Sequence, residues 1–365
     1  MRNSHFYRPW LFFSFAALLP LSASAEKNTN DIYVSVDSFS YSEPAPIDQL
    51  IDNFEGPEPD SGEVAFTFNQ AEIGANFGKW QVGVFTRYDY LLEFNSDTVE
   101  LFYRDSNDLP FPINRTYNVN IEPNHIEAEG IGVGYQFVVT PSLTITPRLN
   151  YLKADAATRG FLRGEIIANE DGDYEGELVL DYIYEEDILL DREQESISGE
   201  GFSLDVAAQW QIAKNWTLNA YLKDYYSEIY WDDVTFTQAR ANTNTVTFDD
   251  EGRLDSIPVL SGREGFRDFT QTLPQRGKLV VNHQMTSVMS VSAQIDHVEE
   301  YVYSRLAWQA NWGGWGIASG YQFETEAFDL AFTSKYFSLK LIADSTDVEE
   351  AHTLGLSMNV SIPVF

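Results

Sequence analysis

The densest group of potential ligand residues is an acidic run at positions 169–177, Asn-Glu-Asp-Gly-Asp-Tyr-Glu-Gly-Glu. Closely spaced carboxylates separated by glycines suit Ca²⁺, which takes roughly six to eight oxygen ligands. The run does not match the EF-hand loop, because the required glycine and the terminal glutamate are misplaced. Two interpretations stay open. An exposed acidic turn is favoured, and the alternative is a weak calcium site formed by Asp171, Asp173, Glu175 and Glu177.

Groups suited to catalysis are scarce. The chain has no cysteine, and four of its five histidines are scattered beyond residue 25. No Ser–His motif, zinc-type histidine cluster or phosphate-binding glycine loop is present. The two closest acid–histidine pairs, His125 with Glu127 and His297 with Glu299, fit interfacial strand positions better than a catalytic rim. The sequence therefore predicts that the protein is not an enzyme and needs no cofactor.

Composition excludes several other classes. The chain carries 56 acidic and 23 basic residues, a formal net charge of −33, so it lacks the cations that neutralise nucleic-acid phosphates. Aromatic residues make up 15% of the chain, which argues against disorder. Beyond the N-terminus no apolar run approaches the roughly 18 residues of a membrane-spanning helix. The acidity and the aromatic content both require another explanation.

The N-terminus predicts export from the cytoplasm. Two arginines precede a short apolar stretch at Trp10–Leu21, and the small-residue motif Ala23–Ala25 follows. This pattern is typical of a secretory signal peptide, because the apolar stretch is too short to span a bilayer. We expect a signal peptide at residues 1–25, cleaved near Ala25, and a single domain at residues 26–365.

The rest of the chain is built from paired alternating segments. Apolar side chains recur at every second position of Ala71–Phe77, a turn follows at Gly78-Lys79, and the alternation resumes over residues 82–88. A period of two over roughly ten residues is a strand signal. Six such hairpins, together with Asp31–Tyr41 paired to His352–Phe365, predict a closed antiparallel β-barrel of about 14 strands, within a range of 12–16. The other five turns are expected at residues 140–142, 213–215, 285–287, 313–314 and 334–336.

Connections between the hairpins differ sharply in length. The hairpin turns take two to four residues, whereas the first four connections are long and hold 34 of the 56 acidic residues. Short turns on one side and long loops on the other are typical of a transmembrane barrel with short periplasmic turns and long extracellular loops. A short helix is expected at Pro46–Phe54 from its apolar spacing. The long connections are 42–62, 95–124, 154–198 and 227–270.

Aromatic residues gather at the two ends of the predicted strands. Tyrosines dominate the ends beside the long connections, and five of the eight tryptophans lie beside short turns. Two aromatic girdles at the two membrane interfaces use amphipathic rings in this way. The tryptophans in question are Trp80, Trp210, Trp216, Trp312 and Trp315.

Together the signal peptide, the alternating strands, the girdles and the terminal Phe365 resemble a Gram-negative outer-membrane β-barrel of the porin-like kind. The resemblance is architectural and involves no family-specific motif. It implies residence in the outer membrane, contact with its lipid and lipopolysaccharide, and recognition of Phe365 by the barrel-assembly machinery. Phe365 is one position out of step with the alternation that runs from Leu354 to Val364, and Pro363 marks a place for a bulge that restores the register.

If the apolar set faces lipid, the alternate residues line a polar interior. Opposite charges within it either create a transverse field that selects solutes or neutralise each other in a filled barrel. We expect a channel for passive passage of small solutes, cation-leaning because of its acidic loops. The alternative is a non-transporting barrel with a structural or surface-binding role. The lumen candidates are Arg87, Asp89, Arg148, Asp205, Gln209, Lys223, Asp296, Arg305, Gln309, Asp329 and Lys340.

Overall fold

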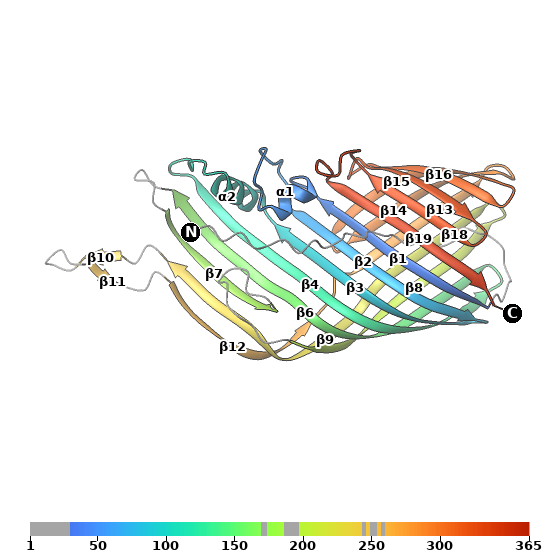
Figure 1. The fold of residues 1–365 in the computed structure, drawn as a ribbon, viewed down its shortest axis with the longest axis horizontal. Coiled ribbons are helices and arrows are strands. Elements are labelled where there is room, and N and C mark those ends of the chain that lie inside the picture. Colours follow the sequence, from blue (N-terminus) through green and yellow to red (C-terminus); the bar gives the residue numbers. More distant parts are fainter. Residues whose placement is uncertain are drawn as a thin grey trace.

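The computed structural model describes residues 30–168, 174–185, 197–242, 246–248, 254–256 and 260–364. Strands dominate it, and fourteen of them close into an antiparallel barrel (Figure 1), which confirms the predicted fold class. The wall runs through β1 (Asp31–Ser42), β2 (Val64–Phe77), β3 (Trp80–Phe94), β4 (Thr116–Tyr135), β6 (Leu143–Ala168), β8 (Gly199–Ala213), β9 (Trp216–Asn242), β13 (Arg276–Gln284), β14 (Met289–Val298), β15 (Tyr301–Trp312), β16 (Trp315–Gln322), β17 (Phe328–Ser334), β18 (Phe337–Ala343) and β19 (Thr353–Pro363).

Closure depends on the first and last strands. β1 pairs with β2 on one edge and with β19 on the other, in a ladder that runs from Asp31 opposite Pro363 to Tyr41 opposite Thr353. Because every backbone edge of the ring is then paired, no open sheet edge is left within the barrel wall. The six predicted hairpins also form, with tight turns such as the one at Gly78, where φ is +60°. We call the end of the barrel that carries these turns the turn end, and the opposite end the mouth.

Two strands extend far beyond the closed wall. β9 has 27 residues, or roughly 90 Å of strand, whereas crossing a bilayer takes about 9–11 residues. Past the barrel, β6 and β9 pair with β7 (Tyr174–Tyr184), and β9 pairs with β12 (Leu260–Gln271). These strands form the sheet that projects to the left in Figure 1. Short strands β10 (Val246–Phe248) and β11 (Leu254–Ser256) form a separate hairpin, and β5 (Phe137–Thr140) continues β4 toward its turn.

Part of the predicted long loops is therefore regular structure. The connections at 154–198 and 227–270 contain the projecting strands, because the alternation continues past the membrane-crossing length. The connection at 95–124 contains α2 (Ser96–Ser106), which the apolar spacing did not predict, and the start of β4. Its N-cap Asn95 accepts a hydrogen bond from the backbone N–H of Thr98 at 2.9 Å.

Both helices lie near the mouth (Figure 1). α1 (Ile47–Ile51) is shorter than the helix expected at Pro46–Phe54. Outward-facing Ala65 and Phe94 of the wall pack with Val99 of α2, so the helices cover the outer face of the upper wall. Neither helix of the described chain is long and apolar enough to cross a membrane.

The outer face of the barrel is apolar. Side chains that alternate outward, such as Ile73, Val84, Ile131 and Leu306, are each more than half exposed. A protein in water buries such side chains, whereas hydrocarbon covers them at no cost. The five tryptophans beside the short turns are exposed as well, as a girdle at the turn end requires. This outer surface fits a membrane.

Candidate functional site

A cluster of charges crosses the barrel interior and is named here the cross-lumen bridge: Arg87, Asp89, Asp224 and Arg276. The Arg87 guanidinium donates to both carboxylate oxygens of Asp224, at 3.0 and 2.8 Å, and through Nε to Asp89 at 2.9 Å. Arg276 lies 3.2 Å from Asp89 and 3.5 Å from Asp224. Arg87 and both carboxylates are almost fully buried. Two cations face two anions, so the bridge is electrically balanced.

The bridge joins strands of the barrel wall that are not neighbours. Arg87 and Asp89 lie on β3, whereas Asp224 lies on β9 and Arg276 on β13. Strands β4, β6 and β8 separate β3 from β9 around the ring, so the ion pairs span the interior and do not follow the wall. Asp205 of β8 supports the far side by accepting the Asp224 backbone N–H at 2.9 Å.

A second crossing contact lies beside the bridge. Arg148 of β6 pairs with Glu72 of β2 at 2.9 Å, and Tyr33 of β1 donates to Glu72 at 2.5 Å. Lys223 of β9 likewise donates to Gln70 of β2. These contacts show that wall side chains reach across this level of the interior.

Glycines make room for these long side chains. A Cβ atom at Gly132 would collide with the Arg148 guanidinium. On the far wall Arg305 of β15 holds Asp329 of β17 with two hydrogen bonds of 2.6 Å, across the intervening strand β16. Gly320 of β16 lies beneath this pair, and a Cβ there would come within 2.7 Å of Arg305 Nε. The interior glycines therefore allow charged side chains to reach over a strand.

An aromatic layer lies on the mouth side of the bridge. Tyr41, Phe66 and Phe68 of β1 and β2 meet Tyr303 of β15, with ring centroids of Tyr41 and Tyr303 at 5.6 Å. The Arg276 guanidinium lies 4.0 Å from the centroid of Phe68, which joins the aromatic layer to the bridge. The sequence prediction missed this layer, although the same alternation that places Arg87 inside also places these rings inside.

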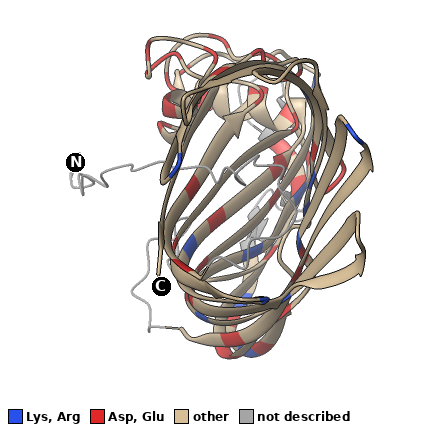
Figure 2. Cartoon of the chain, turned by 90° about the vertical axis from the view of Figure 1, so that its right-hand side faces the viewer, with Lys and Arg blue, Asp and Glu red and all other residues tan. Residues whose placement is uncertain are grey.

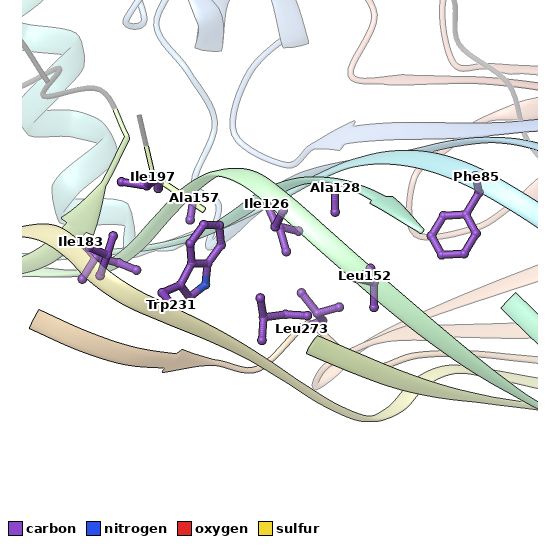
Figure 3. Close-up of a cluster of buried hydrophobic side chains, with 12 residues drawn as sticks. Phe85, Ile126, Ala128, Leu152, Ala157, Ile183, Ile197, Trp231 and Leu273 are labelled. Carbon is purple, nitrogen blue, oxygen red and sulfur yellow. The ribbon is translucent and has the colours of Figure 1, made fainter. Parts of the chain in front are cut away.

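The projecting sheet has an apolar inner face of its own (Figure 3). Trp231 of β9 packs with Ile126, Ile183 and Leu273, and the Trp231 indole N–H donates to Gln271 at 3.0 Å. Gln271 in turn donates to Asn124 Oδ1 and to the His125 carbonyl, both at 2.8 Å. The connection between β12 and β13 thus crosses the interior to reach β4.

The mouth holds a polar cleft of about 570 Å³, named here the mouth cleft. Glu63, Glu93, Glu122, Glu299 and Glu300 line it, and among the described residues Arg159 is the one arginine or lysine that does so. Figure 2 shows acidic residues recurring in the loops at the top of the barrel. The mouth is therefore strongly negative, whereas the bridge below it is balanced.

The structure places the predicted lumen residues as follows. Arg87, Asp89, Arg148, Asp205 and Lys223 belong to the bridge or its supports. Arg305 and Asp329 form the far-wall pair. Asp296 accepts a hydrogen bond from Gln294 and lies 3.9 Å from Lys278. Gln309 donates a hydrogen bond to Asn311. Lys340 is buried, whereas Gln209 is exposed near the turn end. Sequence reasoning did not identify Asp224, which lies where the β8–β9 register shifts, or Arg276, which is the first residue of β13.

Three residues of the remaining predicted sites lie outside the described residues: Asp171 and Asp173 of the calcium hypothesis, and the assembly residue Phe365. Glu175 and Glu177 are on β7, where Glu177 pairs with Arg240 of β9. Within the described ranges no group of three or more metal-ligating side chains is present. Calcium binding at this hairpin stays a prediction.

Comparisons with known proteins give structural likenesses only. No family model matches the chain, and no curated protein matches it. The toluene transporter TodX of P. putida is 10% identical, with a TM-score of 0.44 over 92% of this chain and 89% of that one. The toluene transporter TbuX of Ralstonia pickettii is 10% identical at 0.43 (92% and 89%), and the outer-membrane protease OmpT of Escherichia coli is 10% identical at 0.23 (93% and 96%). At these values the likenesses carry no argument about function. The chain itself has the architecture of an outer-membrane β-barrel protein.

Proposed function

We propose that this protein is a channel of the Gram-negative outer membrane for small solutes, closed by the cross-lumen bridge in the conformation described here. Solute would pass down its gradient without any bond being made or broken, so the protein is not an enzyme. The observation that carries the proposal is a barrel with an apolar outer face whose polar interior is crossed by ion pairs between side chains of its own wall.

The chemistry of the cross-lumen bridge supports a role as the gate of the proposed channel. A barrel that served only as a scaffold would gain stability from an apolar filling, because burying ion pairs costs desolvation that their attraction barely offsets. Here Arg87 and Asp224 come from walls separated by three strands. Ion pairs exchange readily for contacts with water, so side-chain rotation can open a hydrated path without breaking the backbone ladder.

We also propose a cation-leaning entrance. The carboxylates of the mouth cleft outnumber its arginine by five to one. Such a field concentrates cations and repels anions within a Debye length, about 8–10 Å at physiological salt. The balanced bridge adds no further preference, so the entrance and not the constriction sets this bias.

Solute flux into liposomes tests the proposal. Purified protein, folded as judged by resistance to SDS at room temperature, is reconstituted and the rate of swelling in small sugars and amino acids is measured. A rate above that of empty liposomes is expected. A rate equal to that of empty liposomes, for both the native protein and a variant with the bridge neutralised, would instead favour a non-transporting barrel.

A further inference from the structure

Three polar side chains on neighbouring strands form one row of the ladder, named here the Lys340 row. Lys340 of β18 lies opposite Ser357 of β19, and Ser357 lies opposite Asp37 of β1. Outward residues such as Leu341 and Leu356 alternate with them, so the three side chains face the interior.

These side chains lack the partners that the bridge residues have. Lys340 is 7% exposed and Ser357 is 1% exposed. The Ser357 hydroxyl makes no hydrogen bond, and within the described chain no ion pair joins either Lys340 or Asp37. A buried hydroxyl without a hydrogen bond and a buried lysine without an ion pair each cost free energy, so something must offset that cost.

The charged groups around Lys340 are already paired with one another. Arg305, Asp329, Lys278 and Asp296 are the charged groups that act most strongly on Lys340. Asp329 holds Arg305 in a two-pronged pair, and Asp296 faces Lys278 at 3.9 Å. Their charges cancel in pairs, which leaves Lys340 and Asp37, two strands apart, without an ion-pair partner. Two strand spacings correspond to roughly 9–10 Å between backbones.

We propose that the Lys340 row is a binding subsite for a small zwitterion with separate ammonium and carboxylate groups, as in an amino acid. The carboxylate of the solute accepts hydrogen bonds from Lys340 and from the Ser357 hydroxyl. Its ammonium group donates to Asp37. A solute with only one charge satisfies only one end of the row. This inference rests on the proposed channel function and names the class of solute that the interior holds.

Thermal unfolding of the folded barrel tests the subsite without requiring conductance. A ligand that binds only the folded state raises its unfolding midpoint in a saturable way. The probe is 4-aminobutyrate, compared at equal ionic strength with butyrate and butylammonium, which each carry one of its two charges. We expect a saturable rise with 4-aminobutyrate and at most a small rise with either analogue. Equal shifts for all three, or no saturable shift, would overturn the proposal and leave water as the occupant.

Two variants remove the charges separately. Lys340→Met and Asp37→Asn are each expected to abolish the response to 4-aminobutyrate, while the SDS-resistant folded form shows that the barrel still assembles. The matched control is Lys335→Met, because Lys335 is exposed in the turn between β17 and β18. A response that survives in both interior variants would also overturn the subsite.

Conductance recorded on the same preparations separates the two proposals. A conducting protein that shows no response to 4-aminobutyrate refutes the subsite and leaves the channel standing. A response to 4-aminobutyrate, when neither the native protein nor R87Q/D89N/D224N ever conducts, refutes the channel and leaves the binding site standing.

Discussion

Arg87 is the residue on which the closed interior most depends. It donates to Asp89 and Asp224 from a position that is 3% exposed. Removing one member of a buried pair leaves uncompensated charge, at a cost of about 3–5 kcal/mol. We therefore expect Arg87→Ala to lower the free energy of unfolding by about that amount, measured by urea denaturation of the barrel in detergent. The triple variant R87Q/D89N/D224N keeps hydrogen-bonding groups and leaves Arg276, whose side chain is 17% exposed, as the one charge of the bridge, so it should lose less than Arg87→Ala.

A loss from the triple variant as large as that from Arg87→Ala would contradict this account of the bridge. It would mean that the packing of these side chains, and not their charge, stabilises the folded barrel.

Gly320 is predicted to tolerate no side chain. A Cβ at this position would clash with Asp329 and approach Arg305 Nε to 2.7 Å. Gly320→Ala should therefore destabilise the barrel by about 1–3 kcal/mol through overpacking of the far-wall pair. Gly134→Ala is the matched control, because its nearest neighbour, Gln81 Oε1, is 3.4 Å away. Urea midpoints that fall equally in both variants would show that strand glycines matter only through the backbone.

Alternation along the strands determined which residues face inward, and no more than that. It placed Arg87, Asp89 and Arg305 inside, but it could not show that Arg87 meets Asp224 across 137 residues of chain. The pairing depends on the cross-section of the closed barrel. Positions at a bulge, such as Asp224 with φ +52°, escape a strict two-residue period.

Helix α2 is an element held by its own electrostatics at the mouth. Burial opposes ionisation of Asp97, but hydrogen bonds from Asn118 and Arg115 outweigh it and lower the pKa of Asp97 below 3.8. Burial also opposes ionisation of Glu100, but interactions led by a hydrogen bond from Arg104 outweigh it, so the pKa of Glu100 is lowered as well. A carboxyl group whose pKa is lowered by folding stabilises the folded state at pH values above its pKa in the unfolded chain. That contribution is lost as the pH falls through its pKa in the folded protein.

We therefore expect α2 to loosen below about pH 4, while the barrel ladder persists. Hydrogen exchange measured by mass spectrometry should show faster exchange over residues 96–106 at pH 3 than at pH 6, after correction for intrinsic rates. Asn95→Ala removes the N-cap and should accelerate the same segment at both pH values, since such a cap contributes about 1 kcal/mol. Protection of α2 that does not change with pH would contradict the role assigned to Asp97 and Glu100.

At the scale of elements, short turns were easier to predict than long connections. The hairpin turns are local, so Gly78 and the Gly313-Gly314 pair identify them from sequence. The projecting sheet depends on β6, β7, β9 and β12 meeting over long distances in the chain. Nothing local distinguishes a strand that ends at the membrane from one that continues past it.

For the molecule as a whole, acidic residues are concentrated in the four long connections, which hold 34 of the 56, and five glutamates line the mouth cleft. We expect neutralisation of the mouth cleft by Glu93→Gln and Glu122→Gln to lower the cation-to-anion permeability ratio, measured as a reversal potential in a salt gradient. The change should be greater at 10 mM salt than at 0.1 M, because the Debye length falls from about 30 Å to about 10 Å. Both variants are made in the R87Q/D89N/D224N background, so that the gate is open. A permeability ratio that stays the same in these variants would show that residues outside the mouth cleft determine the selectivity.

The most direct test of the central claim compares single-channel conductance of the native protein with that of R87Q/D89N/D224N in planar bilayers. The bridge closes the interior through charge pairs between strands that are not neighbours in the wall, so removing three of its four charges should turn rare, brief openings into long-lived steps of stable size. The folded state of both proteins is checked by SDS resistance before recording. Native protein and variant with the same conductance, whether both silent or both open, would contradict the claim that Arg87, Asp89 and Asp224 form the gate.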